Sequence, residues 1–352
     1  MSYALSSIVG CAGLPHTVGI MSKTSWNIII GVVVVCLLIA GGVMLVVAPA
    51  QSPKASLSGS VLVSSTIDAN AAFLDTYAVK VDGSGVSQVG EDSSSVGDYY
   101  SFSRDGSKAV FVGTTAMRAQ QVNAHQIPAG DIMQVYEAPV SAGHVPLVGE
   151  ARQVSTDHAI HKMEPSISDD GALIAYVTMG SSSRSVASST IHVIEAASST
   201  EIVSLPGTIP QWLNTVAFYY IAPDGVRLYN TASRSSALVA PITGQQNFKL
   251  SVSPDHTMLA FSNPDSRSVY FYQITNNGLT LQAVKTLDVL GFWTVFSPDS
   301  RYVAIQTAAA APDGSLSNPS LSIYATSTFT QVDSITLGAL LNDRLFVTAW
   351  TR

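Results

Sequence analysis

The residues best suited to chemistry lie in one short segment, Asp157–Glu164, which reads D-H-A-I-H-K-M-E. His158, His161 and Glu164 are spaced by three, so a single helical turn would bring their side chains together. Two imidazoles and a carboxylate are ligands that zinc and other transition metals accept. A short loop need not be helical, however, and no cysteine lies nearby. The segment allows two interpretations, a metal site and a set of solvated loop residues.

A second candidate site is cationic and would serve binding. Its members lie in segments that we expect to be loops on one face of the fold. They are Arg118, His125, His158, Lys162 and Arg184. Together they would form a basic rim on an otherwise acidic domain, which suits an anionic glycan or a carboxylate-bearing peptide.

The elements that must position these residues are copies of a repeated unit, clearest in Trp293–Ile305, which reads W-T-V-F-S-P-D-S-R-Y-V-A-I. Two strands with alternating apolar residues flank a Ser-x-Asp turn, which is the signal of a β-hairpin. The turn aspartates of the copies are Asp105, Asp170, Asp255 and Asp299, and Asn214 stands in once. Most copies are roughly 40–45 residues apart, a spacing typical of propeller blades.

The chain resembles the TolB-type, WD-repeat-like β-propeller repeats over roughly residues 57–352. The resemblance rests on the Ser-Pro-Asp cores Ser253–Asp255 and Ser297–Asp299, and on the Ser-x-Asp-Gly forms Ser103–Gly106 and Ser168–Gly171. It implies a propeller fold. Propellers host many unrelated activities, so it implies little about function. TolB itself carries an additional N-terminal domain with no counterpart in this sequence, so its partners are not transferred.

We therefore predict an all-β fold, a six-bladed β-propeller, with seven blades as the alternative. Five blades are expected to start near residues 98, 164, 209, 248 and 291. The remaining blade would be shared by the ends of the domain, Val61–Val89 and Leu340–Trp350, so that the ring closes without exposed sheet edges.

The turn aspartates are expected to form turns and not to bind ligands, because Asp accepts hydrogen bonds from backbone two residues ahead. The long loops, where binding usually occurs, are expected at Thr114–Gly130, Met179–Ser189 and Ala308–Pro319, all on one face. A cluster of large aromatic residues is predicted to be core: Trp212, Phe218, Tyr219 and Tyr220.

The N-terminal part of the chain predicts a membrane anchor. Residues 1–25 form a short tail, 26–48 a transmembrane helix, 49–60 a flexible linker and 61–352 the propeller. Ile28–Val47 contains no charged residue and is long enough to span a bilayer. Two alternatives remain, cleavage as a signal peptide after Ala50 and a true start at Met21. We expect the N-terminus in the cytoplasm and the propeller outside it.

Composition narrows the classes of function. Only 12% of the residues are charged and the net charge is −7, which argues against nucleic-acid binding because that needs a basic stripe. The two cysteines, Cys11 and Cys36, both precede the propeller. The sequence contains no Gly-x-Ser-x-Gly, no His-Glu-x-x-His and no phosphate-binding glycine loop, so we name no catalytic residue.

These observations predict a membrane-anchored, extracytoplasmic propeller that binds a protein or glycan partner or acts as a scaffold at the cell envelope. No cofactor is expected, apart from the metal ion considered above. The alternative is a metal-dependent hydrolase or lyase with its site at the mouth of the propeller channel. Three or more converging His, Asp and Glu side chains at that mouth would favour the enzyme, and serine and apolar residues would favour the binding module.

Overall fold

The computed structural model describes part of the chain. The described residues are 57–65, 75–89, 98–114, 133–156, 160–179, 186–241, 249–263, 267–310, 316–337 and 345–352. The chain divides into two units, Met1–Ala55 and Ser56–Arg352. The expected tail, membrane helix and most of the linker lie outside the described residues. Within those residues, no helix is long and apolar enough to cross a membrane.

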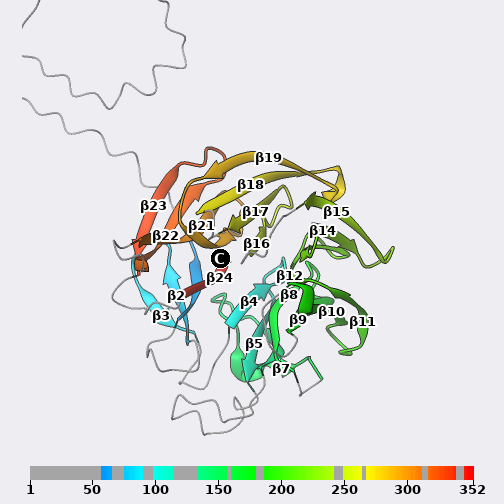
Figure 1. Ribbon diagram of the computed structural model, residues 1–352. Helices are drawn as coiled ribbons and strands as arrows, with labels where there is room; N and C mark the ends of the chain where they lie inside the picture. Colours follow the sequence, from blue (N-terminus) through cyan, green and yellow to red (C-terminus); the bar gives the residue numbers. More distant parts are fainter. Residues whose placement is uncertain are drawn as a thin grey trace, which may run out of the picture. The chain divides into compact units, whose positions relative to one another are not determined.

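Six four-stranded antiparallel sheets surround a central channel, which confirms the six-bladed β-propeller (Figure 1). We name the strands of each blade a to d from the channel outward. Blade 2 contains β4 (Asp98–Phe102), β5 (Lys108–Thr114), β6 (Met133–Pro139) and β7 (Arg152–Gln153). Blade 3 contains β8 (Lys162–Ile167), β9 (Leu173–Met179), β10 (Ser189–Glu195) and β11 (Glu201–Pro206). Blade 4 contains β12 (Thr208–Trp212), β13 (Ala217–Ala222), β14 (Gly225–Asn230) and β15 (Ser235–Pro241). Blade 5 contains β16 (Lys249–Val252), β17 (Met258–Asn263), β18 (Ser268–Thr275) and β19 (Thr280–Leu287). Blade 6 contains β20 (Gly291–Phe296), β21 (Tyr302–Ala310), β22 (Leu316–Ala325) and β23 (Gln331–Thr336).

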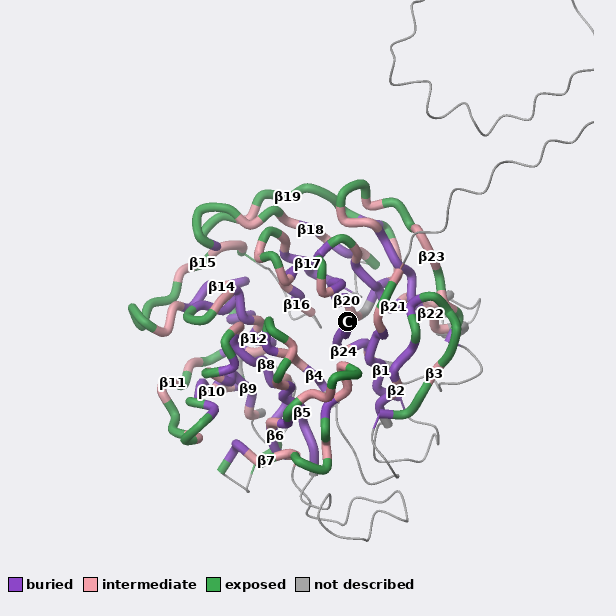
Figure 2. The backbone as a smooth tube through the Cα atoms, turned by 180° about the vertical axis from the view of Figure 1, so that it is seen from behind, coloured by how far each residue is buried: buried purple, intermediate pink, exposed green. Residues whose placement is uncertain are grey.

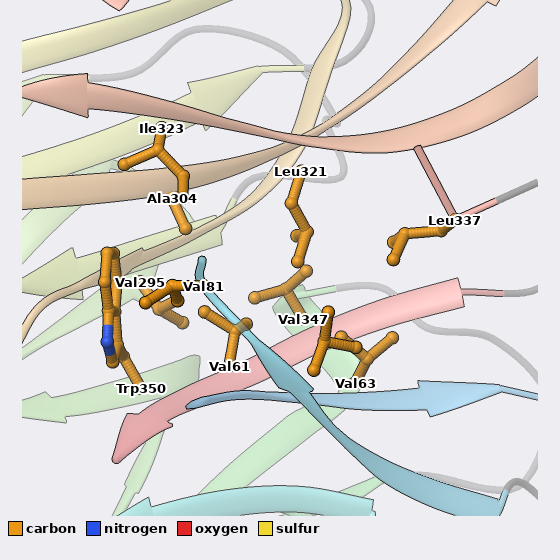
Figure 3. Close-up of a cluster of buried hydrophobic side chains, with 11 residues drawn as sticks. Val61, Val63, Val81, Val295, Ala304, Leu321, Ile323, Leu337, Val347 and Trp350 are labelled. Carbon is orange, nitrogen blue, oxygen red and sulfur yellow. The ribbon is translucent and has the colours of Figure 1, made fainter. Parts of the chain in front are cut away.

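Blade 1 is shared by the two ends of the domain, as the sequence predicts. Its innermost strand is β24 (Leu345–Thr351), and β1 (Ser60–Ser65), β2 (Asp75–Lys80) and β3 (Val86–Gln88) follow outward. Apolar packing between blades 1 and 6 stabilises the closure of the ring. Val61 and Val347 pack in one cluster with Leu321 and Ile323 (Figure 3). Trp350 Nε1 also donates to Ser58 O over 3.2 Å, which fixes the entering chain beside β24.

The two faces of the propeller differ in their connections. The a–b and c–d turns form one face, the turn face, and the b–c and d–a connections form the other, the loop face. The inner strands of the blades are mostly buried, and outer strands such as β19 are largely exposed (Figure 2).

The Ser-x-Asp turns are built alike in blades 2, 3, 5 and 6. In blade 5, Ser253 Oγ donates to Asp255 Oδ1 over 2.6 Å and accepts from Met258 N over 2.9 Å. Asp255 Oδ1 also accepts from Thr257 N over 3.1 Å. The fourth turn residue has a positive φ in each copy, which explains glycine at two of them: Gly106, Gly171, His256 and Ser300. The turn aspartates are structural, as expected.

The aromatic cluster of blade 4 is core, as predicted: Trp212, Phe218, Tyr219 and Tyr220 are each less than 8% exposed. One loop prediction needs correction. Within Ala308–Pro319, residues Ala309 and Ala310 pair with Ser317 and Leu316, so β21 and β22 extend well into the expected loop. The sequence carries a turn signal, Pro312-Asp313-Gly314, between these strand ends, and the expected loop extends too far on both sides of it.

Candidate functional site in the central channel

A ring of six residues, one from the innermost strand of each blade, surrounds the channel near the loop face. We call it the channel ring. Its members are Tyr99 in β4, Glu164 in β8, Ile209 in β12, Lys249 in β16, Trp293 in β20 and Phe346 in β24. Figure 2 labels these six strands around the centre of the propeller.

Contacts between its members, some of them across the channel, hold the ring together. The Tyr99 ring lies 5.6 Å from that of Trp293 and 6.5 Å from that of Phe346, centroid to centroid. Lys249 Nζ lies 4.0 Å from the centroid of the Trp293 ring, a cation–π contact. The same ammonium lies 3.0 Å from Glu164 Oε1. Glu164 Oε2 in turn accepts from Ile209 N over 2.9 Å, so the contacts run through all six blades.

β-Bulges place several of these side chains. The pairing of the innermost strand with its neighbour shifts register at this level in blades 2, 3, 4 and 6. Tyr99, Glu164 and Ile209 have φ values of 57°, 51° and 54°. A β-bulge changes the direction in which a side chain points and leaves one residue without a partner in the neighbouring strand. Pro165 and Pro210 follow two of these residues, and proline suits a bulge because it has no N–H to contribute to the ladder.

Glu164 is ionised within this ring. Burial alone would raise the pKa of its carboxyl group. The charge of Lys249, together with hydrogen bonds from Lys249, Thr208 and Ile209, outweighs burial and lowers the pKa below its usual value. Thr208 Oγ1 donates to Glu164 Oε2 over 2.7 Å. The carboxylate therefore joins blades 3, 4 and 5.

Two adjoining cavities lie on the turn-face side of the ring. The inner one, of about 210 Å³, is lined by five ring members and by the residues that follow them in the innermost strands, such as Thr294 and Thr348. The outer one, of about 190 Å³, reaches the turn face. The two share Ser101 and Trp350 among their walls. The two cavities thus form a well, with the ring at its inner end, which we call the floor, and its mouth on the turn face.

The mouth of the well carries mostly basic residues. Its ionisable residues are Arg104, His144, Asp169, His256 and Arg352. Asp169 Oδ2 lies 3.4 Å from Arg104 Nη1 and 2.9 Å from His256 Nε2, so one carboxylate links the turns of blades 2, 3 and 5. The walls below it are apolar and aromatic, with Phe102, Trp212 and Trp350. The well therefore combines serine, apolar and aromatic walls with His144, Asp169 and His256 at its mouth.

The residues expected to form the basic rim are largely outside the described part of the chain. This holds for Arg118, His125, His158 and Arg184, whose roles stay predictions. Lys162 lies in β8, is 1% exposed, and donates from Nζ to Ile160 O over 2.7 Å.

The expected metal ligands are only partly described. His161 Nδ1 accepts from Met133 N over 3.1 Å, and Glu164 belongs to strand β8 and the channel ring. Among the described residues, no group of three His, Cys, Asp or Glu side chains could hold a metal ion. His158 lies outside them, and the proposed metal site stays a prediction.

Sequence reasoning missed the channel ring, although a signal was present. Tyr99, Glu164, Lys249 and Trp293 each lie four residues before the serine of a Ser-x-Asp turn. Aligning the repeats on that serine places an acid and a base at the same position of two inner strands. Strands that line one channel bring such residues face to face.

Comparisons with known proteins agree with this fold. No protein-family model matches the chain, and no curated protein matches it. Among solved structures, TolB from Acinetobacter baumannii superposes with a TM-score of 0.56 at 16% identity, over 83% of this chain and 66% of that chain. The chain thus spans just under two thirds of TolB. An oligogalacturonate lyase in complex with manganese gives 0.46 at 10% identity, over 73% and 69% of the two chains. The Cps50 (Swd1) propeller domain from Myceliophteria thermophila gives 0.47 at 12%, over 79% and 86%. At these identities the likeness concerns the fold alone, and that fold is a TolB-like β-propeller.

Proposed function

We propose that this chain is a protein-binding module that takes up a segment of a partner protein in its central channel, through the mouth on the turn face. The observation that supports this most is the well itself, which has a built floor at the channel ring and adjoining cavities of about 190 and 210 Å³. Together the two cavities reach the lower part of the roughly 300–1,000 Å³ range of ligand sites. A few side chains of a polypeptide fit such a space.

The chemistry of the well indicates which segment would enter. Arg104 and Arg352 at the mouth outnumber Asp169, so acidic residues of the partner would be favoured there. Phe102, Trp212 and Trp350 would cover apolar parts of the same segment, since buried aromatic residues contribute much of the energy of interfaces.

Residues 26–48 would anchor the module in a membrane, with the propeller outside the cytoplasm. The support is the uncharged stretch Ile28–Val47. The chain enters the propeller at Ser58 and Gly59, beside Trp350 and Thr351 of the channel mouth. Extraction of membranes at alkaline pH tests the anchor: the full chain should stay with the lipid, and a variant carrying two charged residues in place of Val33 and Val34 should not.

Site-specific photo-crosslinking in cells tests the binding mode. A photoreactive phenylalanine analogue at Arg104, whose side chain is 54% exposed at the mouth, should crosslink to a protein. Leu238 on the outer strand β15, 45% exposed, is the matched control and should not. Ile160, 41% exposed on a d–a connection, reports on the loop face. Crosslinking from Ile160 without crosslinking from Arg104 would contradict entry through the turn face. A crosslinked product that resists proteases but not glycosidases would identify a glycan.

A further inference from the structure

The floor of the well carries hydrogen-bonding groups that the chain itself does not use. Thr294 in β20 lines the inner cavity and is 5% exposed, and its Oγ1 has no hydrogen-bond partner among the described residues. A buried hydroxyl left unpaired costs about 1–3 kcal/mol, so such groups are rare and need a physical reason. A ligand group that reaches the floor supplies one.

Lys249 provides the second group. Its ammonium has three N–H donors. Among the described residues, Glu164 Oε1 accepts from it and the Trp293 ring lies beneath it. The Lys249 side chain is 19% exposed and lines the same cavity as Thr294. The cavity is therefore lined by an N–H donor, Lys249, and by Thr294, whose hydroxyl both donates and accepts.

The charges of the floor cancel. Glu164 is ionised because its pKa is lowered, and Lys249 lies 3.0 Å from it. An incoming carboxylate would face Glu164, and an incoming ammonium or guanidinium would face Lys249. Either would be desolvated next to a pair that is already neutral, which is costly without a new opposite charge. An uncharged group avoids that cost.

We propose that the floor of the well binds one uncharged amide group, the side-chain amide of an asparagine or glutamine carried by the entering segment. The amide carbonyl accepts from Lys249 Nζ, and the amide NH₂ donates to Thr294 Oγ1. The flat amide lies among the aromatic walls of Tyr99 and Trp293. This inference rests on the proposed uptake of a partner segment and names the group that reaches furthest into the channel.

Small planar probes of matched size test the charge preference directly. The full chain in detergent is labelled with fluorotryptophan, and the signal of Trp293 is identified by its loss in Trp293→Phe. Acetamide, acetate and guanidinium are then titrated at equal concentrations. In the unaltered chain, acetamide should shift the Trp293 signal saturably, and the two ions should bind at least about tenfold more weakly. Equal or tighter binding of either ion, or no response to acetamide, overturns the proposal.

Two charge variants should invert this preference. Glu164→Gln leaves Lys249 without its counter-ion, so acetate should become the preferred probe. Lys249→Met leaves the Glu164 carboxylate, so guanidinium should become preferred. If acetamide stays preferred in both, charge balance does not set the selectivity and the proposal fails.

Thr294→Val keeps every charge and nearly the same shape, and therefore gives a second test if a charge variant does not fold. It should weaken acetamide binding about fivefold or more, the effect of one hydrogen bond. Thr190→Val on β10, away from the channel, is the control and should leave binding unchanged. Unaltered binding in Thr294→Val overturns the assigned hydrogen bond. Since these probes need no partner, selective acetamide binding without crosslinking from Arg104 would refute segment uptake while leaving the amide preference intact.

Discussion

Lys249 Nζ lies 3.0 Å from Glu164 Oε1 and joins the innermost strand of blade 5 to that of blade 3 across the channel. Blade 4, between them, is tied to the same carboxylate through Thr208 and Ile209. One ion pair thus connects three blades that are separate sheets, and the aromatic members of the channel ring connect the other three. The pair is both part of the structure and the floor of the candidate binding site.

Replacing one partner of this ion pair should destabilise the propeller more than replacing both partners together. Glu164→Gln and Lys249→Met should each lower the free energy of unfolding by about 1–3 kcal/mol, because each leaves its partner uncompensated. The side chains are 16% and 19% exposed, so the cost stays below the roughly 3–5 kcal/mol of a fully buried pair. The double variant should cost clearly less than the sum. Denaturant unfolding of all four proteins measures this, and additivity within about 0.5 kcal/mol would show that the pair is not coupled.

The closure of the shared blade should be sensitive to Gly59. This residue has a φ of 91°, and a Cβ there would lie 2.0 Å from Thr351 O. Gly83 has a φ of 76° and open space around the same position. Gly83→Ala should therefore cost only the backbone strain, about 1–2 kcal/mol. Gly59→Ala should cost more and lower the melting temperature further. Equal shifts in the two variants would mean that the contact with Thr351 does not hold the closure.

The turn aspartates should make the domain sensitive to acid. Hydrogen bonds from Ser107 and Ser103 lower the pKa of Asp105. For Asp255 and Asp299, burial alone would raise the pKa, but hydrogen bonds within each turn outweigh it and lower it. A lowered folded pKa means that the stabilisation is present above the unfolded value and is lost as the pH falls through the folded value. Stability should therefore decline below about pH 4.

Asparagine variants isolate this effect, because the amide oxygen can still accept the turn hydrogen bonds. A chain with Asp105→Asn, Asp255→Asn and Asp299→Asn should lose less stability between neutral pH and about pH 3 than the unaltered chain. A chain with amide variants of three exposed residues, Glu150, Glu195 and Asp288, controls for net charge. Denaturant midpoints across the pH series give the comparison, and parallel curves would argue against the turns as the source.

The metal prediction calls for elemental mass spectrometry of the purified full chain after mild dialysis. We expect no stoichiometric transition metal, because Glu164 is already bonded to Lys249, Thr208 and Ile209. A stoichiometric metal that is lost in His158→Ala or His161→Ala would instead support the metal-dependent hydrolase or lyase.

The propeller fold could be predicted from short sequence patterns, whereas the channel ring could not. Each Ser-x-Asp turn is fixed by residues within five positions of one another, so the hairpins and blade count were predictable. The shared blade was predictable because incomplete strand sets occur at both ends. The channel ring depends on contacts between residues as distant as Tyr99 and Phe346. Such contacts form only when the ring of blades closes. The β-bulges that set the directions of the Glu164 and Ile209 side chains cannot be recognised from the alternation of apolar and polar residues.

The central claim, that the well receives the partner, is tested most directly by blocking the well. In a chain with Cys11 and Cys36 replaced by serine, Ser101→Cys places one thiol where the two cavities meet. Leu238→Cys places it on the exposed outer strand β15. Each is labelled with the same bulky maleimide, and calorimetry measures binding of the partner identified by crosslinking from Arg104. The label at Ser101 should weaken binding by about 100-fold or more, and the label at Leu238 should leave it unchanged. Equal affinity in the two labelled chains would contradict the account.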